Sequence, residues 1–218
     1  MQGLAEFFEH GGTFMYLNVV CSAVTLAIIV ERTIFFLGKG SVNARAFLEQ
    51  LRKLIAANNV DRAVKLCSAT EAPVARVAKA GLQRLSKGEA QIATAIEETM
   101  ADVTPELKKR VAALWSVANI ATLLGLLGTI SGLIRSFAAV GSASPEQRSA
   151  LLSKGIAEAM YNTAFGLGIA VTCMIGHVFL SAAAKKQASE LETFSLKLEN
   201  LLSENIPHSS MQQGTGGR

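Results

Sequence analysis

Charge is what this chain of 218 residues has least of. Only 17% of its residues are Asp, Glu, Lys or Arg, and 50% are apolar. Charges are nearly absent from three windows: residues 4–30 contain two acidic side chains, residues 111–134 contain none, and residues 155–184 contain only Glu158. Each window reaches the roughly 20 residues that a helix needs to cross about 30 Å of hydrocarbon. We therefore predict an all-α integral membrane protein with three transmembrane helices.

Cysteine is also scarce, and the motifs of common cofactor sites are missing. The chain has three cysteines, Cys21, Cys67 and Cys173, and no two of them have CxxC spacing. Two lie in predicted spans and one lies between spans, so neither disulfides nor a thiolate metal site is supported. No GxxxxGK[ST] run is present to bind a nucleotide. We expect no cofactor and no metal.

Basic residues are missing before the first window, which excludes the positive n-region of a cleaved signal peptide, so we expect the first span to be retained. Thirteen Lys and Arg residues lie in 39–110, three in 135–154 and four from Lys185 onward. The positive-inside rule then predicts that the amino terminus and the 135–154 connection lie outside, and that residues 38–110 and the carboxyl terminus lie in the cytoplasm. The basic residues alternate with acidic ones, so nucleic acid is not an expected partner.

Helical periodicity between and after the spans predicts more helices, separated at Asn58-Asn59, Ala72-Pro73 and Lys87-Gly88. Thr104-Pro105 is typical of a helix start, and we expect the second membrane helix to begin there; Ser144-Pro145 should start the third. The predicted organisation is 1–37 for the outside amino terminus and first span, 38–110 for a small cytoplasmic helical domain, 111–134 for the second span, 135–154 for an external loop, 155–184 for the third span, 185–206 for a cytoplasmic helical extension, and 207–218 for a disordered tail.

Adjacent opposite charges, Glu31 and Arg32, end the first span. They either pair with neighbouring helices or mark the membrane interface, with the Arg32 side chain reaching up to the headgroups. We prefer the second interpretation, because long charged side chains at helix ends commonly serve as interfacial anchors.

Small and polar residues follow one face of each of the last two spans when the residues are placed at 100° intervals. Such faces allow helices to approach closely and suit a protein interior better than lipid. For the glycines we prefer helix packing, while lining of a pore stays open. The second span presents Ala118, Ala121, Thr122, Gly125, Gly128, Thr129, Gly132 and Ser136, and the third presents Gly155, Glu158, Asn162, Gly166, Ala170, Cys173 and His177, with Thr163 at the edge.

Depth in the membrane brings one carboxylate and two hydroxyls to similar levels. The second helix runs outward and places Thr129 about 9 Å inside the outer interface, while the third runs inward and places Glu158 about 6 Å and Thr163 about 13 Å below Lys154. An ionisable group in hydrocarbon costs about 2.5–3.5 kcal/mol on insertion scales, so it persists mainly where it has a partner or water. Glu158, Thr129 and Thr163 are therefore our candidate ion pathway. The alternative is an interfacial ion pair of Glu158 with Lys154, one turn away.

An enzyme is the less favoured class. Ser131 and His177 resemble parts of a proteolytic dyad, but helical rise separates them by about 20 Å along the membrane normal, whereas a dyad needs about 3 Å. His177 is more typical of a helix-packing residue, and His10 and His208 lie in expected surface segments. We predict no enzymatic activity.

Three motifs resemble the MotA/TolQ/ExbB proton channel family, and its TolQ/ExbB branch most closely. They are the run from Leu123 to Gly132 (LLGLLGTISG), Gly155 to Ala159 (GIAEA), and Thr163 to Leu167 (TAFGL), in order on adjacent spans. The three-span topology and the cytoplasmic helical insert agree with this resemblance. Tyr161-Asn162 departs from the family pattern, in which small apolar residues are common before the threonine.

The resemblance implies a homopentamer around the single membrane helices of a dimeric partner similar to ExbD or TolR, whose helix carries an essential Asp. Protons would pass that Asp between Thr129 and Thr163, with Glu158 at the family's acidic position. Other pore-lining or packing candidates are Thr122, Gly125, Gly132, Asn162 and Gly166. The implied function is a proton-conducting stator of an inner-membrane motor that energises transport, envelope integrity or gliding motility. Sodium as the coupling ion and a non-conducting membrane scaffold are the alternatives.

Overall fold

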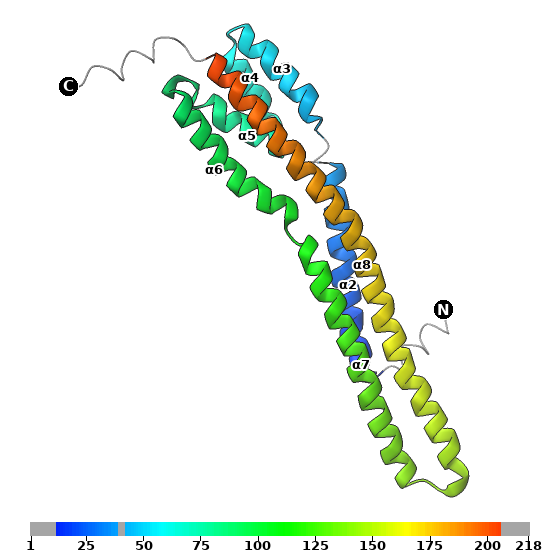
Figure 1. The fold of residues 1–218 in the computed structure, drawn as a ribbon. Coiled ribbons are helices and arrows are strands. Elements are labelled where there is room, and N and C mark those ends of the chain that lie inside the picture. Colours follow the sequence, from blue (N-terminus) through cyan, green and yellow to red (C-terminus); the bar gives the residue numbers. More distant parts are fainter. Residues whose placement is uncertain (1–11, 39–41, 206–218) are drawn as a thin grey trace, which may run out of the picture. The chain divides into compact units, whose positions relative to one another are not determined.

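The chain is helical wherever its structure is described. The computed structural model describes residues 12–38 and 42–205, and these contain no strand. Three stretches are long and apolar enough to cross a membrane, Thr13–Leu37, Glu89–Gly141 and Pro145–Glu204. The predicted fold class is confirmed. The helices labelled in Figure 1 are α2 (Gly12–Leu37), α3 (Ala44–Ala56), α4 (Val60–Ser68), α5 (Pro73–Leu82), α6 (Glu89–Lys108), α7 (Val111–Gly141) and α8 (Pro145–Glu204). A 3-10 turn (Leu85–Lys87) lies between α5 and α6.

The helices form two compact units. Within the described residues, the span unit comprises 12–32 and 110–181, and the head unit comprises 33–38, 42–109 and 182–205. The two long helices α2 and α8 contribute to both units. The predicted outside amino terminus, the disordered tail 207–218, His10 and His208 lie largely or wholly outside the described residues, so these expectations stay predictions.

The predicted external loop is mostly helical. Helix α7 runs to Gly141 and α8 begins at Pro145, which leaves only residues 142–144 between them. The start of the third helix at Ser144-Pro145 is confirmed, because Pro145 is the first residue of α8. A connection of two to five residues suffices to join antiparallel helices, so nothing forces residues 135–141 or 145–154 out of helical geometry. Whether they lie outside the membrane stays a prediction.

The start of the second membrane helix was predicted wrongly. Thr104 and Pro105 lie inside α6, which continues to Lys108. The helix is interrupted only at Lys109 and Arg110, before α7 begins. Arg110 adopts the left-handed region with φ 64°, and α7 starts at the next residue. Val103 and Leu107 explain the difference, because both are buried in the head unit on either side of the proline. Their packing keeps α6 helical although the proline cannot donate a backbone hydrogen bond.

The head unit is built around an apolar core shared by α3, α4, α5, α6 and the last turns of α8. The predicted separators are confirmed: Asn58 takes a left-handed φ of 53°, Pro73 opens α5, and Gly88 precedes α6 with φ 92°. Helix α8 continues through the predicted extension to Glu204. Its apolar residues enter the core; the fully buried or nearly buried ones are Leu191, Phe194, Leu198 and Leu202.

In the span unit, glycines let α7 and α8 pack backbone against backbone. A Cβ atom added to Gly166 would lie 2.6 Å from the carbonyl oxygen of Ala121, and one added to Gly125 would lie 3.1 Å from the carbonyl oxygen of Asn162. A Cβ atom at Gly128 would lie 2.7 Å from Cγ of Asn162. We call this contact the glycine interface; its members are Gly125, Gly128 and Gly132 on α7 and Gly155 and Gly166 on α8. The preferred interpretation of these glycines, helix packing, agrees with this geometry.

Opposite the glycine interface, α7 presents an apolar face. Leu123, Leu127, Ile130 and Ile134 are all exposed in the single chain. A face of this composition is suited to lipid or to a second membrane helix.

Two glycines of α8 provide a matched test of the glycine interface. Gly166→Ala should lower the free energy of unfolding by about 1–3 kcal/mol, since the new methyl meets the Ala121 backbone and overpacks the contact. Gly168→Ala should leave stability unchanged or raise it, because nothing lies within 4 Å of its Cβ position and Ala favours helix. Thermal unfolding of the purified full-length variants measures both, and equal effects would contradict the close approach.

Cys67 is a test of the head-unit core. Its side chain is buried on α4, and this burial raises the pKa of the thiol to about 11, with only partial opposition from the positive charge of Lys79. Because the thiolate is the reactive form, maleimide labelling of Cys67 at pH 8 should be slow in the folded protein and should accelerate after denaturation. Peptide mass spectrometry follows Cys67 separately from the other two cysteines. Rapid labelling of the folded chain would mean that this core is open.

Candidate functional site

Thr163 and Thr129 meet at the edge of the glycine interface. The Thr163 hydroxyl donates to the carbonyl oxygen of Gly125 at 3.1 Å, and its oxygen lies 3.4 Å from that of Thr129. Thr129 itself donates to the carbonyl oxygen of Leu126 at 2.6 Å. Both side chains are half-buried. The structure therefore brings together the two hydroxyls that the sequence placed at similar depth, and their remaining lone pairs can accept hydrogen bonds from water or a proton donor.

Glu158 lies near this pair but does not touch it. It precedes Thr163 by five residues, about 7.5 Å along α8, and no hydrogen bond joins its carboxylate to either threonine in the described chain. Its side chain is half-buried. The described residues also show no ion pair between Glu158 and Lys154, so the alternative of a local pair is not realised in the single chain. The carboxylate stays available to a group from outside this chain.

The other predicted residues divide between packing and lining. Gly125, Gly132 and Gly166 belong to the glycine interface, and Asn162 is buried with its amide against Gly128. Thr122 is half-buried and donates its hydroxyl to the carbonyl oxygen of Ala118 at 3.0 Å. Of these five, Thr122 best fits a lining residue, because it is not needed to bring the helices together.

Helix α2 contributes a buried polar stripe that the sequence analysis missed. Asn18, Thr25 and Arg32 are at most 5% exposed and recur every seven residues, whereas many apolar residues of the same helix are exposed. Thr25 donates to the carbonyl oxygen of Cys21 at 2.8 Å and lies 3.0 Å from the sulfur of Cys173 on α8. The signal that could have revealed this interior face is a polar residue at every second turn of an apolar span.

Asn18 places this stripe at the level of the hydroxyl pair. A Cβ atom on Gly166, one turn from Thr163, would lie 3.3 Å from the amide nitrogen of Asn18. Neither the nitrogen nor the oxygen of the Asn18 amide has a hydrogen-bond partner among the described residues. Buried polar groups inside membrane bundles are costly and commonly mark functional regions. The first span therefore contributes a buried polar side chain beside the hydroxyl pair.

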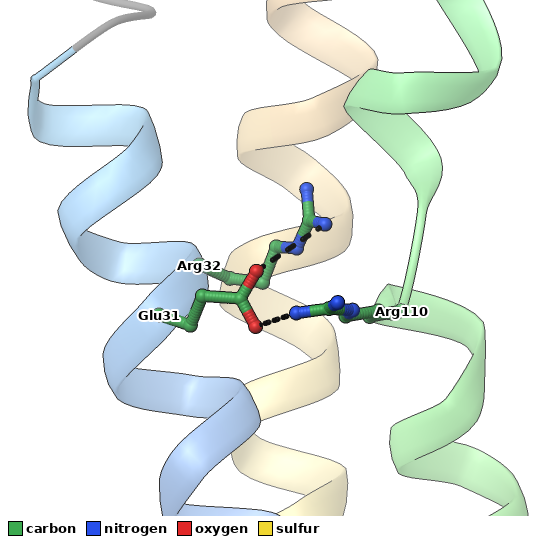
Figure 2. A network of polar contacts seen from close by, with 3 residues as sticks. All are labelled: Glu31, Arg32 and Arg110. Atoms are coloured by element: carbon green, nitrogen blue, oxygen red, sulfur yellow. Dashed lines mark hydrogen bonds and ion pairs between the residues drawn. The ribbon is translucent and has the colours of Figure 1, made fainter.

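A cluster of three charges lies where α2 approaches the start of α7 (Figure 2). The Glu31 carboxylate pairs with the guanidinium of Arg110 and lies 3.8 Å from that of Arg32. Arg32 is 5% exposed. The preferred interpretation is thus wrong for Glu31, whose carboxylate joins α2 to the start of α7 through Arg110, while Arg32 is buried beside it. Glu31 also neutralises the cation carried by Arg110, the residue in left-handed conformation before α7.

His177 packs α8 against the first turn of α7. Its Nδ1 atom lies 3.0 Å from the carbonyl oxygen of Val111, and its ring centroid lies 6.2 Å from that of Trp115. Ser131 is twenty residues further along α7 than Val111, about 30 Å by helical rise. The exclusion of a Ser-His dyad therefore agrees with the geometry. No group of three potential metal ligands occurs among the described residues.

Comparison with known proteins agrees with this geometry. Residues 69–193, more than half of the chain, match the model of the MotA/TolQ/ExbB proton channel family. The chain is 28% identical over 179 residues to the biopolymer transport protein ExbB-like 3 of Synechocystis sp., covering 78% of this chain and 85% of the relative.

Two further relatives are similar over most of their length. Biopolymer transport protein exbB1 of Vibrio cholerae is 28% identical over 204 residues, covering 88% of this chain and 85% of that protein. The biopolymer transport protein ExbB of Neisseria gonorrhoeae is 27% identical over 207 residues, covering 86% of this chain and 91% of that protein. With three membrane-length helices, the two threonines in contact and a family match over more than half its length, the chain belongs to the MotA/TolQ/ExbB proton channel family.

Proposed function

We propose that this protein is the proton-conducting stator subunit of an inner-membrane motor that uses the proton-motive force to energise an envelope process. The observation that carries the proposal is the contact between Thr163 and Thr129, two half-buried hydroxyls on adjacent membrane helices. The names of the relatives refer to biopolymer transport. Envelope integrity and gliding motility are the other processes that such a motor could drive.

Each of the three candidate residues has a distinct proposed role. Thr129 and Thr163 offer hydroxyl oxygens that accept hydrogen bonds and so order water beside a moving proton. Glu158, about 7.5 Å away along α8 on the outer side, draws protons toward them by its negative charge or by transient protonation. Its half-burial without an ion pair to Lys154 supports this role, because a purely structural carboxylate would be expected to have a local partner.

We further propose that the working unit is a homopentamer around a dimer of ExbD- or TolR-like single-span subunits. The single chain leaves Thr129, Thr163 and Glu158 partly accessible and without an acidic partner in the described residues, which suits an Asp carried by a central partner helix. The exposed apolar residues of α7 would face other copies or lipid. The proposed orientation is a periplasmic amino terminus and a cytoplasmic carboxyl terminus, as the distribution of basic residues indicates.

Proton flux in proteoliposomes tests the proposal directly. The full-length chain would be reconstituted with the single-span protein that co-purifies with it, and flux would be followed with an internal pH-sensitive dye under an imposed potential. Glu158→Ala and the double variant Thr129→Val with Thr163→Val should abolish flux, since they remove the carboxylate and the hydroxyls without adding bulk. Both should still assemble, as judged by size-exclusion chromatography with the partner.

Matched controls come from the same helix. Thr172→Val changes an exposed threonine of α8 that bonds only to the carbonyl oxygen of Gly168, and Glu146→Ala removes a carboxylate from the first turn. Both should conduct normally. Conduction by Glu158→Ala and by the double threonine variant would refute the assignment of the pathway. A wild-type complex that assembles but never conducts protons or sodium ions would favour the scaffold.

A further inference from the structure

The hydrogen bond between His177 and Val111 fixes which ring nitrogen is free. A backbone carbonyl oxygen can only accept, so at 3.0 Å the Nδ1 atom of His177 must carry the hydrogen. In the neutral imidazole the other nitrogen, Nε2, is then the proton acceptor. No other hydrogen bond to this ring occurs in the described part of the chain. The contact that packs α8 on α7 therefore also presents a basic nitrogen.

His177 lies on the same edge of the α7–α8 pair as the two threonines. Trp115 precedes Thr129 by fourteen residues on α7, and His177 follows Thr163 by fourteen residues on antiparallel α8. Thr129 and Thr163 meet across the two helices, with 3.4 Å between their hydroxyl oxygens, and Trp115 and His177 meet in the same way, with 6.2 Å between their ring centroids. Fourteen residues are nearly four helical turns, so Trp115 and Thr129 point to one side of α7, and His177 and Thr163 point to one side of α8. The edge therefore extends about 21 Å from the hydroxyl pair to the imidazole.

Thr122 lies halfway along this edge, seven residues from both Thr129 and Trp115. Because its hydroxyl donates to Ala118, its oxygen remains an acceptor for water. At the far end, His177 is half-buried and the neighbouring Trp115 is 51% exposed, so the imidazole of His177 can be reached from outside the three helices of this chain. By the proposed orientation this is the cytoplasmic side, where tryptophan side chains are frequent at the membrane interface.

The charged groups near this end do not compete for the free nitrogen. Arg110 precedes Val111 and is paired with Glu31 of α2, and Arg32 of α2 is buried beside that carboxylate. Cys173 lies one turn earlier on α8 and contacts Thr25. Within the described span unit, no carboxylate is paired with His177, so Nε2 is available to water.

We propose that His177 is the proton acceptor at the cytoplasmic end of the ion pathway, a role that rests on the proposed conducting function. A hydronium ion arriving in water along the edge past Thr122 transfers its proton to Nε2: one O–H bond of hydronium breaks as the N–H bond forms, water is left behind, and the ring becomes imidazolium. The same N–H bond then breaks as its proton passes to a cytoplasmic water molecule, which becomes hydronium and leaves the ring neutral. Nδ1 keeps its hydrogen bond to Val111 throughout, so the helices need not move.

Two substitutions separate proton transfer from packing. His177→Asn keeps an N–H donor near the position of Nδ1 and removes Nε2, so the complex should assemble as wild type while flux falls by about tenfold or more. His177→Ala removes both nitrogens, and its flux should be restored by imidazole added on the side of the carboxyl terminus. Added imidazole should not restore Glu158→Ala. Val178→Ala, at the exposed neighbouring residue, serves as the control and should conduct normally.

The outcomes distinguish this inference from the proposed function. If wild type conducts, the threonine and Glu158 variants do not, and His177→Asn conducts at the wild-type rate, then His177 has no part in proton transfer although the pathway is correct. A loss of flux in both His177 variants that imidazole cannot reverse would assign the residue to packing alone and would also overturn the inference. A wild-type complex that never conducts would overturn the conducting function and this inference together.

Discussion

The close approach of α7 and α8 is the contact on which the rest of the span unit depends. Where Gly125 and Gly166 meet backbone atoms of the opposite helix, no side chain separates the two helices. The Thr163 hydroxyl can therefore reach a carbonyl oxygen of α7. Hydrophobic burial cannot drive this association in lipid, so van der Waals packing of small residues and interhelical hydrogen bonds must do so. The same approach brings Thr129 to Thr163 and His177 to Val111. Packing and the proposed pathway thus share one interface, in which glycines set the separation of the helices and polar side chains occupy its edge.

Helix α2 completes this arrangement with an inverted pattern of polarity. Three of its buried residues, Asn18, Thr25 and Arg32, are polar and only Met15 is apolar, while its exposed residues are mainly apolar, as expected for a helix with lipid outside and a polar interior. Thr25 connects it to α8 through Cys173, and Glu31 connects it to α7 through Arg110. The ion pair also lies beside the one left-handed residue that separates α6 from α7. The charged end of the first span therefore connects two helices, since the Glu31 carboxylate pairs with Arg110 and also lies beside the buried Arg32.

Much of the fold could be predicted because the membrane imposes simple rules on sequence. Windows without charge gave the three spans, and periodic apolar residues gave the head-unit helices and the extension of α8, whose Leu191, Leu198 and Leu202 enter the core. Local signals failed where packing overrode them. Thr104-Pro105 has the features of a helix start, but Val103 and Leu107 are buried on both sides of it, and α6 continues. The connection 135–154 was expected to be a loop, although three non-helical residues were enough to reverse the chain.

The sequence by itself determined the fold class, the family and the identity of the candidate residues, because each depends on residue type and spacing along one helix. Small residues and threonines at helical intervals define a face, and helical rise assigns a depth. Only the tertiary structure decided which faces meet. It placed Thr163 against Gly125 and Thr129, and it paired Glu31 with Arg110. It also buried Asn18 beside Gly166. Among the described residues, it formed no ion pair between Glu158 and Lys154. These outcomes depend on the rotation of each helix about its axis and on which helix lies beside it, and periodicity within a single helix carries no information about either.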